Sequence, residues 1–271
     1  MGLGMRFLKQ ICTVAAVCAA TAVEAGSGCT LLQPLGQASK ELQLGDSCDL
    51  RESPGSTFKI PLALMGYDAG LLKSAQEPEW AYDPSLMAPF KSWRQATTPQ
   101  RWLRYSVVWY SQRLTRELGM LQFQRYVDDL NYGNRDLSGD TGQDNGLTHA
   151  WLSSSLKISP QEQMDFLQKV FAEDTAVSPQ AHQKLRQALP DYEVGDLQVI
   201  GKTGTVWQLE QNGARSSLQT GWFVGLVQEG GEAYVFVHLR REAVAETGFA
   251  GFRARTEILS QLPLLIEQIA H

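Results

Sequence analysis

The sequence predicts an α/β fold in which a central antiparallel sheet is flanked by helices and carries a mostly helical insert. Strand patterns lie near both ends of the chain, helix patterns fill about residues 60–190, and residues 252–269 place apolar side chains on one helical face. With 271 residues, 43% of them hydrophobic, the chain can bury a substantial core. We expect one compact domain over residues 26–271, with a strand-rich lobe from both ends and a helical lobe over about residues 60–190.

The strand patterns predict two hairpins and one further strand. Residues 29–32 and 42–44 are short apolar segments parted by turn-forming residues. Residues 221–227 and 234–239 flank a glycine turn and predict the core hairpin of the sheet. Residues 197–203 predict a third strand that can lie beside this hairpin.

Helix patterns lie in the middle of the chain and at its end. Ser159 is suited to cap a helix that begins at Pro160, because proline is favoured at the first helical position. Pro263 is expected to bend the last helix locally. The predicted helices span residues 60–72, 102–118, 120–130, 160–171 and 252–269.

Residues 1–25 have the pattern of a secretory signal peptide. Arg6 and Lys9 precede an apolar run over residues 11–23, and small residues follow at a candidate cleavage site after Ala25. The run is shorter than the roughly 20 residues that a membrane-spanning helix needs, so a retained anchor is the weaker alternative. We expect a periplasmic protein without a stable membrane anchor.

The cysteines are compatible with one structural disulfide. Cys12 and Cys18 leave with the predicted signal, so the mature chain keeps Cys29 and Cys48. Export to an oxidising compartment permits a bridge between these two. Two unpaired, buried thiols are the alternative, and the sequence leaves both open because bridging depends on a Cα separation below about 7 Å.

The charge pattern argues against a nucleic-acid partner. The formal net charge is −5, from 24 basic and 29 acidic residues, and no basic run reaches five residues. The four histidines have no metal-ligand spacing, so we expect no metal and no metal cofactor. Trp102, Trp109, Trp207 and Trp222 belong to no motif and are expected in the core or in a pocket wall.

Ser56-Thr57-Phe58-Lys59 is the first candidate for catalysis. It follows Pro54-Gly55 and precedes an apolar helix pattern, so Ser56 falls at a helix N-terminus with Lys59 one turn later on the same side. A serine hydroxyl needs an adjacent base, and a lysine serves only if its pKa is lowered. The helix terminus also favours a developing oxyanion.

Three further motifs strengthen this interpretation, because Ser-x-x-Lys alone recurs by chance. Ser106-Val107-Val108 lies in a helical pattern, Tyr132-Gly133-Asn134 in a loop-like stretch, and Lys202-Thr203-Gly204 at the end of a strand. In their order and spacing the chain resembles the penicillin-recognising serine enzymes, and within them the class D β-lactamases, or oxacillinases. Trp151-Leu152 and Leu156-Lys157-Ile158-Ser159 add to this resemblance, which runs from about Gly28 to about Ile269.

The resemblance implies hydrolysis of β-lactam antibiotics, penicillins and oxacillin-type substrates, through a serine acyl-enzyme. Ser56 is the implied nucleophile. Lys59 reacts in this family with carbon dioxide to form a carbamate, which serves as general base and requires a neutral amine in an apolar pocket. Phe58, Val107 and Trp151 are candidates for that pocket, and the indole N–H of Trp151 is the implied donor to the carbamate.

The remaining residues of the implied site contact other parts of the substrate. The resemblance implies that Ser106 passes a proton to the leaving nitrogen, while Lys202 orients that hydroxyl and, with Thr203, the substrate carboxylate. Backbone N–H groups of Ser56 and Thr205 form the implied oxyanion hole. The other residues assigned to the substrate pocket are Val108, Tyr132, Asn134 and Gly204.

The sequence departs from the family at the arginine that often binds the substrate carboxylate. When the last helix is matched by its apolar positions, this arginine falls near Gly251. Arg253 and Arg255 lie two and four residues later, and we take Arg253 as the candidate.

Other functions share these motifs. Penicillin-binding transpeptidases bring additional domains or an anchor, and β-lactam sensors bring a multi-span N-terminal region and are acylated only once. A non-catalytic binding module is a further alternative, which the intact motif residues disfavour. An α/β-hydrolase esterase lacks support because no Gly-x-Ser-x-Gly segment is present. The sequence leaves the β-lactam spectrum and the choice of monomer or homodimer open.

Overall fold

The computed structural model describes residues 1, 28–37, 39–210 and 213–270. The predicted signal peptide over residues 1–25 lies outside this part of the chain, apart from Met1. Within these ranges no helix has both the length and the apolar character needed to cross a bilayer.

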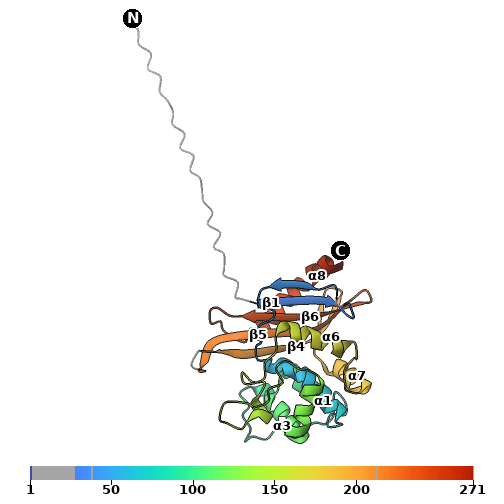
Figure 1. The fold of residues 1–271 in the computed structure, drawn as a ribbon, viewed down its shortest axis with the longest axis vertical. Coiled ribbons are helices and arrows are strands. Elements are labelled where there is room, and N and C mark those ends of the chain that lie inside the picture. Colours follow the sequence, from blue (N-terminus) through green and yellow to red (C-terminus); the bar gives the residue numbers. More distant parts are fainter. Residues whose placement is uncertain (2–27, 38, 211–212, 271) are drawn as a thin grey trace.

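One antiparallel sheet carries the fold, with its strands in the order β2-β1-β6-β5-β4-β3 (Figure 1). The β1–β2 hairpin, the β5–β6 hairpin and the pairing of β4 with β5 confirm the predicted strands. The short strand β3 was not predicted; its four residues alternate between exposed and half-buried. The strands span Gly28–Pro34 (β1), Leu42–Gly45 (β2), Asp191–Val194 (β3), Leu197–Leu209 (β4), Arg215–Glu229 (β5) and Glu232–Arg241 (β6).

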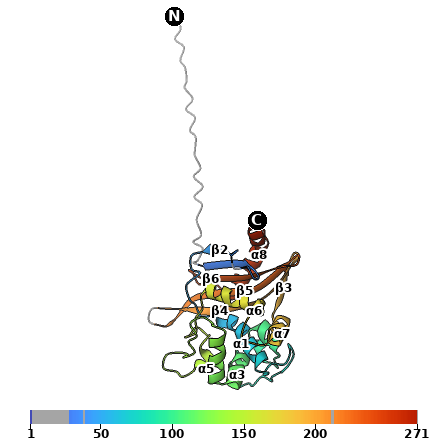
Figure 2. The ribbon, with the colours of Figure 1, turned by 45° about the vertical axis from the view of Figure 1, so that its right-hand side comes forward.

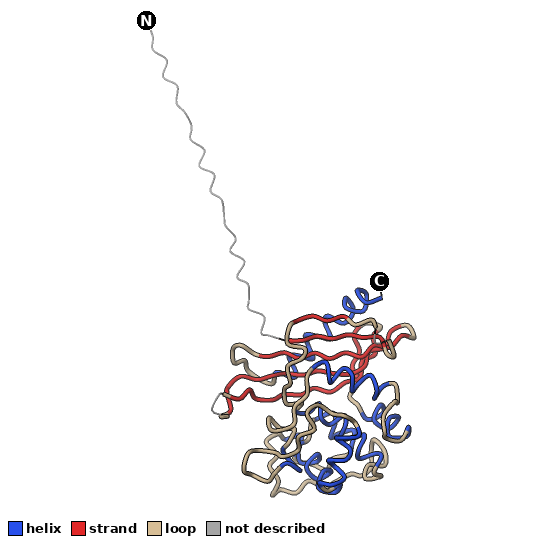
Figure 3. The backbone as a smooth tube through the Cα atoms, viewed as in Figure 1, coloured by secondary structure: helices blue, strands red, loops and turns tan. Residues whose placement is uncertain are grey.

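Helices cover both faces of the sheet, as Figures 2 and 3 show. The C-terminal helix α8, Ala250–Ala270, packs on one face through Ala254, Ile258 and Leu262, which are fully buried against sheet residues. A larger core fills the other side, between the sheet and the helical lobe. This core positions the start of α1, Lys59–Asp68, beneath β4 and β5.

The middle lobe contains the predicted helices, one of them in two parts, and two further helices, α5 and α7, that were not predicted. A continuous helix over residues 102–118 was wrong, because Ser106 has a left-handed φ of 55° and separates two helices. Helix α6 begins as predicted, with a capping box between Ser159 and Glu162. The helices span Pro99–Tyr105 (α2), Val108–Leu118 (α3), Met120–Asp129 (α4), Gly146–His149 (α5), Pro160–Phe171 (α6) and Pro179–Ala188 (α7).

A disulfide joins Cys29 on β1 to Cys48, just beyond β2, with a Cα separation of 5.1 Å. Both residues are buried. The bridge closes a loop with a sequence separation of 19 around the edge hairpin of the sheet.

Replacing Cys29 and Cys48 together by alanine is expected to lower the free energy of unfolding by about 3 kcal/mol, because a loop of this length loses its constraint in the unfolded chain. Urea denaturation of the oxidised protein and the double variant measures the difference. Equal midpoints and slopes would contradict the prediction.

Candidate active site

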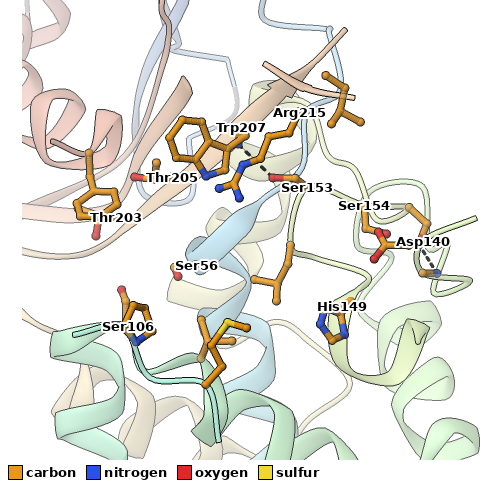
Figure 4. A pocket seen from close by; sticks show the side chains of 18 of the residues that line it. Ser56, Ser106, Asp140, His149, Ser153, Ser154, Thr203, Thr205, Trp207 and Arg215 are labelled. Atoms are coloured by element: carbon orange, nitrogen blue, oxygen red, sulfur yellow. Dashed lines mark hydrogen bonds between the residues drawn. The ribbon is translucent and has the colours of Figure 1, made fainter. Parts of the chain in front are cut away.

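A cleft of about 1640 Å³ lies along β4, and its lining includes Ser56. Residues from the turn between α2 and α3 and from the loops before α2 and after α4 also line it, together with Arg215, Phe249 and Phe252. In Figure 4, Ser56 lies at the centre, with Ser106 and Thr203 to its left and Trp207 and Arg215 above and to its right.

Ser56 and Lys59 are brought together by a short helical turn. The 3-10 helix η1, Gly55–Phe58, carries Ser56 and leads directly into α1, whose first residue is Lys59. Lys59 Nζ donates a hydrogen bond to Ser56 Oγ at 3.1 Å. The lysine side chain has no exposed surface. Burial first, and the charge of Lys202 second, hold the pKa of the Lys59 amine well below its usual value.

Trp151 has a buried indole N–H without an acceptor among the described residues. The indole stacks on Phe58 with ring centroids 5.4 Å apart, and Phe58 meets the edges of Phe123 and Tyr132. A buried donor left unpaired costs about 1–3 kcal/mol. An added acceptor group in this apolar surrounding would remove that cost, and the neutral amine of Lys59 is the form that reacts with carbon dioxide.

Ser106 and Lys202 form a second pair across the cleft. Lys202 Nζ donates to Ser106 Oγ at 2.5 Å and to the carbonyl oxygen of Thr203 at 3.0 Å. The left-handed backbone of Ser106 is uncommon for a residue with a side chain, and such strain is found at functional sites. Burial first, and the charge of Arg255 second, lower the pKa of Lys202 to about 7.

Strand β4 presents alternate side chains to the cleft. Thr203, Thr205 and Trp207 line it, as expected for residues spaced by two along a strand. Beyond Ile200, this edge of β4 has no strand partner within the described residues, because β3 pairs only as far as that residue. The backbone near Thr205 is therefore free to serve the cleft.

Two glycines allow close packing around β4. A Cβ at Gly204 would lie 2.7 Å from the carbonyl oxygen of Pro54, just before the η1 turn that carries Ser56. A Cβ at Gly251 would lie 2.4 Å from the carbonyl oxygen of Gly204. The Gly251 N–H donates to Thr205 Oγ1 at 2.9 Å. The position matched to the family arginine is thus filled by backbone contact between α8 and β4.

The two arginines near Gly251 differ in what contacts their guanidinium groups. Arg253 is paired with the buried carboxylate of Glu242 and, at 3.6 Å, with Glu246. Arg255 lies over the rings of Tyr192 and Phe252. Arg253 is therefore a weaker candidate for carboxylate binding than its sequence position indicates.

The other predicted pocket residues divide into two groups. Val108 and Asn134 line the cleft. Asn134 holds the loop after Trp151, since its side chain donates to the Ser155 carbonyl at 2.8 Å and accepts from the Lys157 N–H at 2.9 Å. Tyr132 is fully buried under Phe58 and bonds Gln163, so it affects the cleft only through the aromatic packing.

Ser53 was not predicted from the sequence as part of the site. It connects the chain just before η1 to the loop that contains Trp151 and Ser153. Its hydroxyl donates to the Trp151 carbonyl at 2.9 Å and accepts from the Ser153 N–H at 3.0 Å. The carbonyl of Ser53 accepts from the indole of Trp222 at 3.0 Å. The one signal in the sequence is that Ser53 lies three residues before Ser56.

Within the ranges given above, no three His, Cys, Asp or Glu side chains are grouped closely enough to hold an ion.

Known proteins are similar to this chain in sequence over most of its length. Residues 32–263 match the family described as penicillin binding protein transpeptidase domain. The chain is 40% identical over 222 residues to β-lactamase OXA-9 of Klebsiella pneumoniae, covering 81% of each protein. It is 37% identical over 220 residues to β-lactamase OXA-1 of Escherichia coli, covering 79% of this chain and 76% of the relative.

A solved structure gives the same result in three dimensions. The crystal structure of OXA-427 class D β-lactamase superposes with a TM-score of 0.82 at 42% identity. The match covers 90% of this chain and all of the other.

Replacing Ser53 by alanine is expected to lower the free energy of unfolding by about 1–3 kcal/mol, because it leaves the buried carbonyl of Trp151 and the partly buried N–H of Ser153 without this partner. Urea denaturation measures this change, and Ser260→Ala on the exposed face of α8 is the control, with a change within about 0.5 kcal/mol. An effect no larger than the control's would contradict the assigned role of Ser53.

Proposed function

We propose a mechanism for this chain from the family to which it belongs, the penicillin binding protein transpeptidase domain family and, within it, the class D β-lactamases. These are serine hydrolases that open the cyclic amide. In the proposed mechanism the chain works through an acyl-enzyme on Ser56. We further propose that Lys59, as its carbamate, supplies the base and that oxacillin-type penicillins are among the substrates. The contact between Ser56 and the buried amine of Lys59 is the observation that carries this proposal.

Acylation starts at Ser56. Its oxygen forms the bond to the lactam carbonyl carbon as its proton leaves toward the base at Lys59. Negative charge then develops on the carbonyl oxygen, and backbone N–H groups of Ser56 and Thr205 are positioned to stabilise it. Support for this assignment comes from the start of η1 and from the unpaired edge of β4.

Ring opening requires a proton at the lactam nitrogen. Ser106 supplies it as the carbon–nitrogen bond breaks, and its hydroxyl is re-protonated from the solvent side through Lys202. The 2.5 Å contact between Lys202 and Ser106 supports this route. Lys202 and Thr203 also hold the substrate carboxylate in this proposal.

The carbamate fits the residues that surround it. When bound, this group supplies a carboxylate-like base that serves both acylation and the attack of water on the acyl-enzyme. Lys59 would hold it covalently, because burial lowers the pKa of the amine and so favours the neutral form that reacts with carbon dioxide. The unpaired indole N–H of Trp151 is the matching donor.

Export is the remaining element of the proposal. Residues 1–25 act as a signal that is removed in the periplasm, leaving one catalytic domain over residues 26–271. The mass of the mature protein purified from the periplasmic fraction tests this assignment.

Turnover distinguishes a β-lactamase from a sensor. Steady-state hydrolysis of a chromogenic cephalosporin and of oxacillin is measured on acid-decarboxylated protein, with and without bicarbonate. We expect many turnovers per molecule, stimulated by bicarbonate because the base is restored, and no acyl adduct with Ser56→Ala. A single stoichiometric burst would instead identify a sensor, and an absence of acylation would overturn the proposed function.

A second prediction concerns pH. The lysine at position 202 is charged below its pKa of about 7 and neutral above it. We therefore expect kcat/KM for penicillins to fall as pH rises through about 7, since the cation that binds the substrate carboxylate is lost. A methyl ester of the same penicillin, which lacks the carboxylate, should show a smaller fall. Equal profiles for acid and ester would contradict this role of Lys202.

A further inference from the structure

Arg215 and Trp207 form a stacked pair at the wall of the cleft. The guanidinium carbon of Arg215 lies 4.1 Å from the centre of the Trp207 ring, and both residues line the cleft. They come from neighbouring strands, since Arg215 begins β5 opposite Leu209 of β4. Figure 4 shows the pair above Ser56.

The aromatic platform is fixed to the scaffold. The backbone N–H of Trp207 donates to Ser153 Oγ at 3.1 Å, which ties β4 to the loop after Trp151. The guanidinium therefore rests on a ring whose strand is anchored on both sides, by β5 and by Ser153.

The charge of Arg215 is not neutralised within the described part of the chain, where no carboxylate forms an ion pair with it. Arg104, also in the cleft lining, pairs with Asp191, and Arg253 pairs with Glu242. Stacking uses the face of a guanidinium and leaves its in-plane N–H donors available. Arg215 is exposed at the edge of the cleft, so its guanidinium is accessible to an anionic ligand, and partial burial lowers the pKa of Arg215.

The proposed mechanism fixes which part of the substrate meets this pair. Ser106 and Lys202 serve the leaving nitrogen, so the ring that carries the usual carboxylate lies on their side of Ser56. The acylamino substituent is attached on the opposite side of the lactam carbonyl. Figure 4 places Trp207, Arg215 and Ser153 on the side of Ser56 that lies away from Ser106. The acylamino substituent would therefore extend toward these residues.

We propose that Arg215, held on Trp207, is a specificity-determining subsite for a carboxylate carried by the acylamino side chain of a β-lactam. The carboxylate accepts two parallel hydrogen bonds from the guanidinium edge, while any aryl group of the side chain packs on the apolar wall. The enzyme then favours dianionic penicillins over their singly charged equivalents. This inference rests on the proposed function.

A matched substrate pair tests the subsite. Benzylpenicillin and its α-carboxylated derivative differ by one side-chain carboxylate, so the ratio of their kcat/KM values isolates its contribution. Arg215→Gln is expected to lower the ratio of derivative to parent about five- to tenfold, in the range of a charge-assisted pair. Arg215→Lys, which keeps the charge but loses the planar fork, should lower it less.

Arg113→Gln is the control, because Arg113 also stacks on a tryptophan, Trp80, but is absent from the cleft lining. This variant should leave the ratio unchanged. Rising salt should reduce the ratio in the wild type and not in Arg215→Gln, since screening acts on the added charge pair.

An unchanged ratio in Arg215→Gln, including an equal loss for both substrates, would overturn the subsite. Failure of the proposed function is distinguishable, because wild-type protein would then not turn over benzylpenicillin. If the protein is acylated without turnover, the same ratio is taken from acylation rate constants. If neither substrate reacts, the subsite fails together with the proposed function.

Discussion

Burial of the Lys59 amine is the constraint on which the rest of the site depends. A lysine with no exposed surface is costly as a cation, so the fold shifts it toward the neutral form. The same amine lies 3.1 Å from Ser56 Oγ, at the turn where η1 passes into α1. An aromatic layer of Phe58 and Trp151 supplies the apolar surroundings, and it leaves one indole N–H unpaired. The Ser56 hydroxyl, the buried Lys59 amine and the indole N–H of Trp151 are thus parts of one packing arrangement.

The sheet completes the site by placing a second lysine on the opposite wall. Lys202 reaches Ser106, whose left-handed backbone breaks the helix that its neighbours would otherwise continue. β4 can approach the chain just before η1 closely because residue 204 is a glycine. In the same way, α8 can approach β4 closely because residue 251 is a glycine. Gly251 therefore stands at the position matched to the arginine that often binds the substrate carboxylate in the family. Arg215, for which no ion pair is found among the described residues, lies at the start of β5 beside the far end of β4 and places a cation in the cleft lining.

Local patterns were sufficient to predict the hairpins, the cap of α6 and the motif segments, since each depends on neighbours in the sequence. The pairing of Cys29 with Cys48 was left open, because it depends on a distance between two strands. The break at Ser106 was missed because its flanking residues favour helix on both sides. The engagement of Arg253 by Glu242 and the stacking of Arg215 depend on tertiary contacts that no local pattern encodes.

A ¹³C NMR measurement on protein equilibrated with ¹³C-labelled bicarbonate at neutral pH tests most directly whether Lys59 carries a carbamate. We expect a carbamate resonance in the wild type that disappears with Lys59→Met and weakens in Trp151→Phe, where the indole donor is lost. The resonance should also fade on acidification, because protonation of the amine competes with carbamate formation. An active enzyme that shows no such resonance at saturating bicarbonate would contradict the claim that burial of Lys59 serves to hold this group.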